Sequence, residues 1–166
     1  LYHIENLTPE AKEQGAGLVA EGAKVYVIDD AELERVKNEY PVMWKKPDAK
    51  PKLCFVGCPH MSLEQLKSWT VRVEEGLKAS GNKKVLIPTV FTTAPAVKAE
   101  FEKTEYAERL KATGVILSYI CPLMYMNNPL CKSMPVMTSS NKLRTYTTAR
   151  YYTEDEILVK ITKGGN

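Results

Sequence analysis

The feature that most constrains the fold is the alternation of short apolar, β-branched runs with helical stretches. Strands are predicted in five such runs, at residues 25–28, 53–56, 85–88, 115–120 and 135–137. Strands that alternate with helices favour parallel βαβ units with right-handed crossovers. The sequence therefore predicts an α/β fold with three layers (α/β/α) and a mainly parallel, roughly five-stranded Rossmann-like sheet.

The ends of the helices have capping signals. Helices are predicted at residues 31–40, 63–79, 95–113 and 154–163. Ser62 and Gln65 stand in the S-x-x-Q order of a capping box, and Thr153 and Glu156 stand in the same relation before the last helix. Such a pair gives partners to two backbone amides that the helix leaves unbonded. Gly114 is suited to a left-handed stop after the third helix.

Composition limits the classes of protein that remain. A chain of 166 residues, 44% hydrophobic and 26% charged, suits one globular domain, here residues 1–166. Its net charge of +3 is scattered, without a basic block, so we expect no nucleic-acid partner. No apolar run approaches the ~20 residues of a membrane span, and no signal peptide is evident. We expect a cytoplasmic protein without membrane contact, and a piece of a longer chain because it begins with Leu1.

Residues with chemical potential follow the predicted strands. Cys58 follows the strand at 53–56, residues 89–95 follow the next, Cys121 follows the fourth, and residues 138–142 follow the fifth. In a parallel sheet the carboxyl ends of the strands lie at one edge, and ligands bind there. We therefore expect these segments to face one cleft.

The cysteines suggest metal or redox chemistry. Cys58 lies just before the helix that Ser62 caps, where free amides and the helix dipole favour a thiolate. Cys121, like Cys58, is followed by a proline, and Cys131 lies in a loop rich in Met and Asn, whereas Cys54 fits the core of a strand. Three thiolates suit an iron–sulfur cluster, whereas Cys with His suits zinc. Spacing does not choose between them, since there is no C-x-x-C pair.

Two further groups are candidates for substrate binding. His60 is a metal ligand, a substrate contact or a loop histidine bonded to the backbone. The TSSNK segment combines hydroxyls, an amide and a cation, which can bind a carboxylate or phosphate through charge-assisted bonds. The same residue types are ordinary turn formers. The members of the segment are Thr138, Ser139, Ser140, Asn141 and Lys142.

Several of these segments carry a family resemblance. GCPHMSLEQL at residues 57–66 resembles the GCPH-x-S signature of the aconitase X family, and LTPEA at residues 7–11 resembles its TPEA element. The Cys121–Pro122 pair and a T-x-S-x-K-x-x-x-Y element, from Thr138 to Tyr146, occur in the order of the family. Two positions depart from the family pattern: Ser139 stands where the family has Asn, and Tyr119–Ile120 where it has Asp-Thr.

The resemblance implies a hydro-lyase. Members of the family are dehydratases that use an iron–sulfur cluster held by three cysteines, with activities that include dehydration of phosphomevalonate and of cis-3-hydroxyproline. It implies that this chain is the carboxyl-terminal part of the large subunit. A small swivelling subunit or domain would complete the site for a small hydroxy acid, so the chain alone is expected to have little or no activity.

The resemblance also assigns roles. Cys58, Cys121 and Cys131 would be the metal ligands, with Cys131 the third by inference. Catalysis is assigned to His60, Ser140 and Lys142, and substrate binding to Ser62, Thr138, Ser139 and Asn141. Two alternatives remain open from the residues themselves: a non-catalytic Rossmann-like interaction or regulatory module, and a zinc-binding domain.

Overall fold

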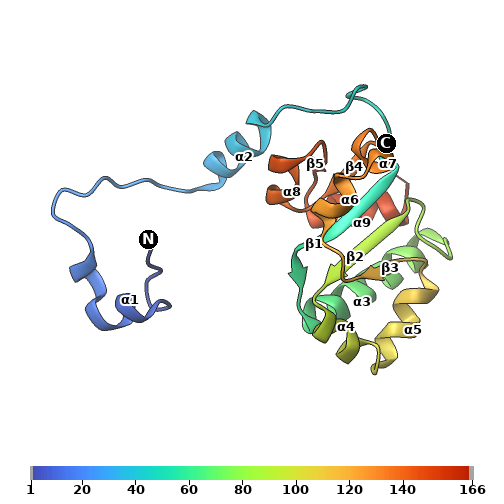
Figure 1. The fold of residues 1–166 in the computed structure, drawn as a ribbon, viewed down its shortest axis with the longest axis horizontal. Helices are drawn as coiled ribbons and strands as arrows, with labels where there is room; N and C mark the ends of the chain where they lie inside the picture. Colours follow the sequence, from blue (N-terminus) through green and yellow to red (C-terminus); the bar gives the residue numbers. More distant parts are fainter. Residues whose placement is uncertain (1, 165–166) are drawn as a thin grey trace. The chain divides into compact units, whose positions relative to one another are not determined.

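The chain separates into two compact units. The structure is a computed structural model that describes residues 2–164. Its units are Leu1–Glu39 and Tyr40–Asn166, and each is described by itself (Figure 1). The sequence predicted one domain over residues 1–166; the α/β fold occupies the second unit.

The first unit is helical. It contains α1 (Pro9–Gln14), the 3₁₀ turn η1 (Gly15–Leu18) and α2 (Asp30–Glu39), which is the helix predicted at residues 31–40. The strand predicted at residues 25–28 is wrong: this segment is extended coil, and its four side chains are each at least 69% exposed. A strand needs a neighbour for its backbone hydrogen bonds, and the described residues of this unit contain no other strand.

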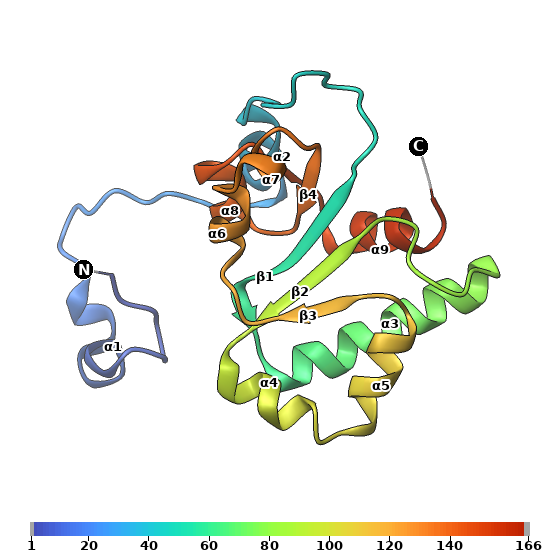
Figure 2. The same cartoon turned by 45° about the vertical axis from the view of Figure 1, so that its right-hand side comes forward.

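The second unit is built on a parallel sheet. Its strands are β1 (Leu53–Met61), β2 (Thr89–Thr93), β3 (Ile116–Ser118), β4 (Val136–Thr138) and β5 (Arg150–Tyr151). They lie in the order β3-β2-β1-β4-β5, and every neighbouring pair is parallel. Figure 2 shows β3, β2, β1 and β4 in this order. The predicted α/β class and five-stranded parallel sheet are confirmed.

Successive residues of the strands supply two separate cores. Cys54 and Val56 of β1 belong to the first core cluster, with Phe91 of β2. Phe55 of β1 belongs to the second, with Val90 of β2. This alternation follows from the two-residue period of a strand, and it shows that both faces of the sheet are covered.

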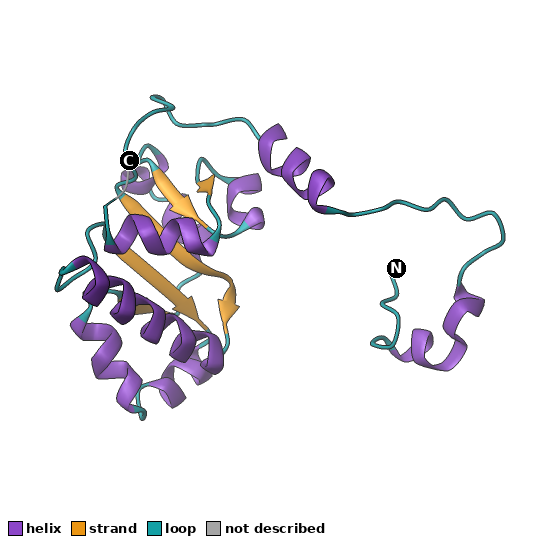
Figure 3. Ribbon diagram, turned by 180° about the vertical axis from the view of Figure 1, so that it is seen from behind, coloured by secondary structure: helices purple, strands orange, loops and turns teal. Residues whose placement is uncertain are grey.

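Helices from different parts of the chain cover the two faces (Figure 3). The first core cluster takes residues from α3 (Leu63–Ser80), α4 (Pro95–Phe101), α5 (Glu105–Ala112) and α9 (Glu154–Thr162). The second takes residues from α6 (Pro122–Met126), α7 (Pro129–Lys132) and α8 (Asn141–Tyr146). The three layers are therefore helix, sheet and helix. None of the described helices is long and apolar enough to cross a membrane.

Several elements differ from the predictions: β1 runs on to Met61, and β3 is shorter than the predicted strand at 115–120. The strand predicted at residues 85–88 is a connection, and β2 begins at Thr89, after Pro88; proline has no amide to donate to a ladder. The helix predicted at 95–113 is two helices, α4 and α5, and the Thr104 hydroxyl bonds the Phe101 carbonyl oxygen at 2.7 Å between them. Strand β5 was missed because two residues carry no detectable period.

Both predicted capping boxes are confirmed. At the start of α3, the backbone amide of Gln65 donates to the Ser62 hydroxyl at 3.2 Å. The backbone amide of Ser62 donates to the side-chain oxygen of Gln65 at 2.8 Å. Thr153 and Glu156 make the same pair at α9. Helix α3 follows directly on β1, so its capping box fixes where the chain leaves the sheet.

Ser62→Ala is expected to lower the free energy of unfolding by about 1 kcal/mol, because one amide of the first turn loses its partner. Chemical denaturation of the protein would measure this. Ser68→Ala on the exposed side of the same helix is the matched control, and it should cost nothing, since alanine favours a helix over serine. Equal losses in the two variants would contradict the capping role.

Candidate active site at the carboxyl edge of the sheet

The strand order reverses between β1 and β4. From β1 the chain continues to β2 and β3 on one side, and β4 and β5 then lie on the other side of β1. The connecting helices change face at the same point, from α3–α5 to α6–α8. In open α/β sheets ligands bind in the crevice outside the carboxyl ends of the strands at such a reversal.

Two groups of predicted site residues lie at this reversal. The Cα atom of Phe55 in β1 pairs with that of Thr138 in β4. Residues 57–62 follow Phe55 closely, and residues 139–142 follow Thr138. The GCPH segment and the TSSNK segment therefore lie near each other at the carboxyl edge. Of the other segments expected at this edge, residues 89–93 are strand β2 itself.

The end of β1 contains a bulge, residues 57–60. Val56 pairs with Phe91 and Met61 with Thr93, so these bulge residues stand opposite Thr92 alone. The Thr92 hydroxyl donates to the Gly57 carbonyl oxygen at 2.6 Å, and the Thr93 hydroxyl donates to the Met61 carbonyl oxygen at 2.6 Å. Both threonines are fully buried. Strand β2 thus anchors the bulge at both ends, in a segment that the sequence had suggested was a loop.

The first residue of the bulge has to be glycine. Gly57 has a φ of +110°, and a Cβ atom built on it would lie 2.2 Å from the carbonyl oxygen of Thr92. Residues with side chains rarely adopt this backbone conformation, and the obstacle is backbone that cannot rotate away. The glycine of GCPH is therefore a requirement for the close approach of β1 to β2.

Gly57→Ala is expected to lower the free energy of unfolding by about 3 kcal/mol or more, since left-handed strain adds to a steric clash. Gly81→Ala is the matched control: φ is +72°, and nothing lies within 4 Å of the position that the added methyl group would take. It carries only the backbone strain, about 1–2 kcal/mol. Thermal and denaturant unfolding of both variants would compare them, and a Gly57→Ala variant no less stable than Gly81→Ala would refute the close-approach argument.

The bulge presents its side chains in opposite ways. Cys58 is half-buried and packs against the second core cluster, whereas Pro59 and His60 are exposed. The peptide bond between Cys58 and Pro59 is cis. Met61 is 4% exposed and belongs to the first core cluster. His60 therefore faces solvent at the carboxyl edge. Cys58 and Met61, on either side of the exposed Pro59–His60 pair, both contact the core.

On the β4 side, two predicted site residues shape the turn. The Ser140 amide donates to the Thr138 hydroxyl at 3.1 Å, and the Leu143 amide donates to the Ser140 hydroxyl at 3.0 Å. Thr138 and Ser140 are 1% and 4% exposed. The Thr138 hydroxyl therefore shapes the turn, and the Ser140 hydroxyl caps α8. Both residues thus act as turn formers, which was the alternative to substrate binding that the sequence left open. Each hydroxyl also carries a proton that it can donate.

The exposed part of this turn is held by an arginine. Ser139 is half-buried, whereas Asn141 and Lys142 are exposed. The Nε atom of Arg144 donates to the Asn141 side-chain oxygen at 2.8 Å. The Arg144 guanidinium lies 3.8 Å from the ring centroid of Tyr40 and 4.9 Å from that of Tyr151. These cation–π contacts hold the arginine that orients Asn141.

The four cysteines fall into different environments. Cys54 is completely buried, and burial raises the pKa of its thiol, so it is a neutral core residue as expected. Cys58 and Cys131 pack against the same core cluster, and Cys121 is the N-cap of α6, after β3. Cys58, in the bulge of β1, and Cys121, after β3, thus lie toward the carboxyl ends of two strands of the sheet. Strands β1 and β3 are separated by β2, so they lie two strand spacings, or about 10 Å, apart.

The donor chemistry of these thiols suits an iron–sulfur cluster, since none of the four cysteines is in a disulfide. Within residues 2–164, however, no three His, Cys, Asp or Glu side chains gather closely enough to hold a metal ion. The structure therefore does not bring Cys58, Cys121 and Cys131 together as a complete ligand set. Their assignment as ligands stays a prediction.

Together, the strand order and the reversal define a doubly wound α/β domain with a candidate site at its carboxyl edge. Residues 51–157 match the family model described as the aconitase X third domain. This match covers more than half of the chain and all five strands of the sheet. The chain therefore belongs to the aconitase X family, as its motifs suggested.

A solved structure agrees on the fold. The chain is similar to the holo-form of aconitase X from Thermococcus kodakaraensis, with a TM-score of 0.60 and 20% sequence identity. The similarity covers 84% of this chain and 36% of the Thermococcus chain. This chain thus spans little more than a third of that relative. A comparison with curated proteins gave no match.

Proposed function

We propose that this chain is the carboxyl-terminal part of the large subunit of an aconitase X-type hydro-lyase that dehydrates a small hydroxy acid. The observation that carries the proposal is the meeting of the GCPH bulge and the TSSNK turn at the strand-order reversal, within a domain that matches the family. Because the chain spans 36% of the solved relative, the activity belongs to the complete enzyme. A small swivelling subunit or domain would complete the site, and the isolated chain would be inactive.

The residues of this chain suit the binding of an anionic substrate. Lys142 is an exposed cation beside Asn141, whose side-chain oxygen accepts from Arg144, so the amide nitrogen of Asn141 is left to donate. A carboxylate or phosphate would accept charge-assisted bonds from these groups. Ser139 lies in the same turn, and Thr138 and Ser140 hold that turn in shape.

Proton transfer is assigned to His60. Its imidazole is exposed at the carboxyl edge, and a histidine can gain or lose a proton near neutral pH. Ser62 follows two residues later, and its hydroxyl and amide are engaged with Gln65. In this proposal His60 orients the substrate or carries the proton removed from it, while Ser62 fixes the start of α3 beside it.

Dehydration also requires the loss of hydroxide, a poor leaving group. An iron–sulfur cluster bound in the complete enzyme would supply Lewis-acid chemistry for this loss. This chain offers thiol donors for such a cluster at Cys58, Cys121 and Cys131. Cys58 is the first candidate, because it lies in the bulge at the reversal.

The test uses the complete protein, purified without oxygen together with its small subunit or domain. We expect it to contain iron and sulfide, to absorb visible light, and to dehydrate a hydroxy acid from a panel that includes phosphomevalonate and cis-3-hydroxyproline. Cys58→Ser is expected to abolish the iron content, the visible absorption and the turnover together.

Cys54→Ala is the control, because this thiol lies in the same strand but is buried in the core. It should lower stability by leaving a small cavity and keep the iron. Zinc in place of iron, no metal in the complete protein, or full iron content in Cys58→Ser would each contradict the proposal.

A further inference from the structure

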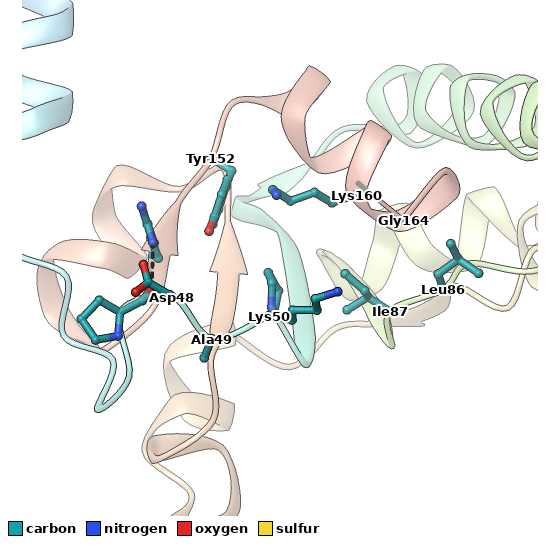
Figure 4. A pocket seen from close by; sticks show the side chains of 11 residues that line it. Asp48, Ala49, Lys50, Leu86, Ile87, Tyr152, Lys160 and Gly164 are labelled. Atoms are coloured by element: carbon teal, nitrogen blue, oxygen red, sulfur yellow. Dashed lines mark hydrogen bonds between the residues drawn. The ribbon is translucent and has the colours of Figure 1, made fainter. Parts of the chain in front are cut away.

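A cleft of about 560 Å³ lies on the α9 side of the sheet, near the amino ends of β1 and β2. Its walls come from residues 47–51 before β1, residues 86–87 before β2, the segment around β5, and α9 (Figure 4). None of the candidate site residues at the carboxyl edge lines it. This volume is typical of small-molecule sites.

The cleft is rich in positive charge. Lys50, Arg150 and Lys160 line it from three different segments, and Asp48 is the acidic residue among the lining residues. Figure 4 shows Lys160 and Tyr152 entering the cleft from α9 and from the end of β5. Cations brought together from separate segments raise the local potential and attract anions.

Two of these cations are held by aromatic rings. The Arg150 guanidinium lies 5.5 Å from the ring centroid of Tyr152 and 5.6 Å from that of Trp44, and it donates to the Pro47 carbonyl oxygen at 3.2 Å. The Lys160 ammonium lies 5.3 Å from the Tyr152 centroid. A guanidinium has five N–H donors and Pro47 takes one, so Arg150 is fixed in position with donors left for a ligand.

The rest of the lining is apolar or neutral. Leu86 and Ile87 contribute aliphatic surface next to the cations, and Leu86 is 49% exposed. Burial raises the pKa of Tyr152, so its hydroxyl is protonated at neutral pH and can donate a hydrogen bond. The cleft therefore offers an anion-binding end and an apolar end.

We propose that this cleft binds a small organic anion, with its carboxylate or phosphate at the Tyr152 end of the cleft, where Arg150 and Lys160 both contact that ring, and with an apolar body against Leu86 and Ile87. Lys50 contributes a third cation to the lining. The site is separate from the proposed catalytic edge and does not depend on the proposed function. Both anionic groups match the planar, multi-donor geometry of a guanidinium.

Isothermal titration calorimetry of the complete protein would test the proposal with phenyl phosphate and benzoate, which separate the two anionic groups, and with benzyl alcohol as the neutral analogue. We expect at least one anion to bind, and benzyl alcohol and inorganic phosphate to bind at least about tenfold more weakly. Lys160→Gln and Arg150→Gln should each weaken binding about tenfold, the usual loss for one charge-assisted contact. Added salt should weaken it further.

A control variant locates the effect. Lys163→Gln removes the same charge at the end of α9 but outside the cleft, and it should leave the affinity unchanged. Circular dichroism would confirm that each variant is folded. If Arg150→Gln unfolds, the anion affinity of Lys160→Gln tests the proposal. Absence of binding by both anions, equal binding of benzyl alcohol, or an equal loss in Lys163→Gln would overturn the proposal.

Discussion

The close contact between β1 and β2 is the constraint on which the candidate site depends. The buried hydroxyls of Thr92 and Thr93 donate to the carbonyl oxygens of Gly57, the first residue of the bulge, and of Met61, which follows its last residue. The bulge can approach β2 only because Gly57 lacks a side chain. Since the backbone is fixed at both ends, the residues between them are presented in one arrangement, with His60 exposed and a half-buried cysteine in the same bulge.

The sheet topology determines which other segment of the chain lies next to the bulge. Because the strand order reverses beside β1 and Phe55 of β1 pairs with Thr138 of β4, the bulge and the turn after β4 follow from neighbouring strands. Hydrogen bonds within that turn hold it in shape. Two of its backbone amides donate to the Thr138 and Ser140 hydroxyls, and Arg144 donates to the side-chain oxygen of Asn141. The two segments thus offer an imidazole, an amide and the cation of Lys142 on a fixed backbone. Such preorganisation is what binding and catalysis require.

Features that depend on residues close together in the sequence were predicted, whereas contacts between distant residues were not. The capping box at Ser62 was found because its partners are three residues apart, and the α/β class was found because the periodicity is local. The apolar run at 25–28 looked like a strand, but a strand depends on a partner elsewhere in the chain, and none pairs with it in the described residues. The hydroxyl bonds of Thr92 and the stacking of Arg144 on Tyr40 join residues 35 and 104 positions apart, and no spacing rule reveals such contacts.

In this proposal the substrate binds at the carboxyl ends of β1 and β4. A crystal structure of the complete enzyme with a bound hydroxy acid would test this most directly. We expect density for the ligand beside His60, with its anionic group within hydrogen-bond distance of Lys142 or Asn141. Density for the ligand at another edge of this sheet, or without contact to either segment, would contradict the proposed site.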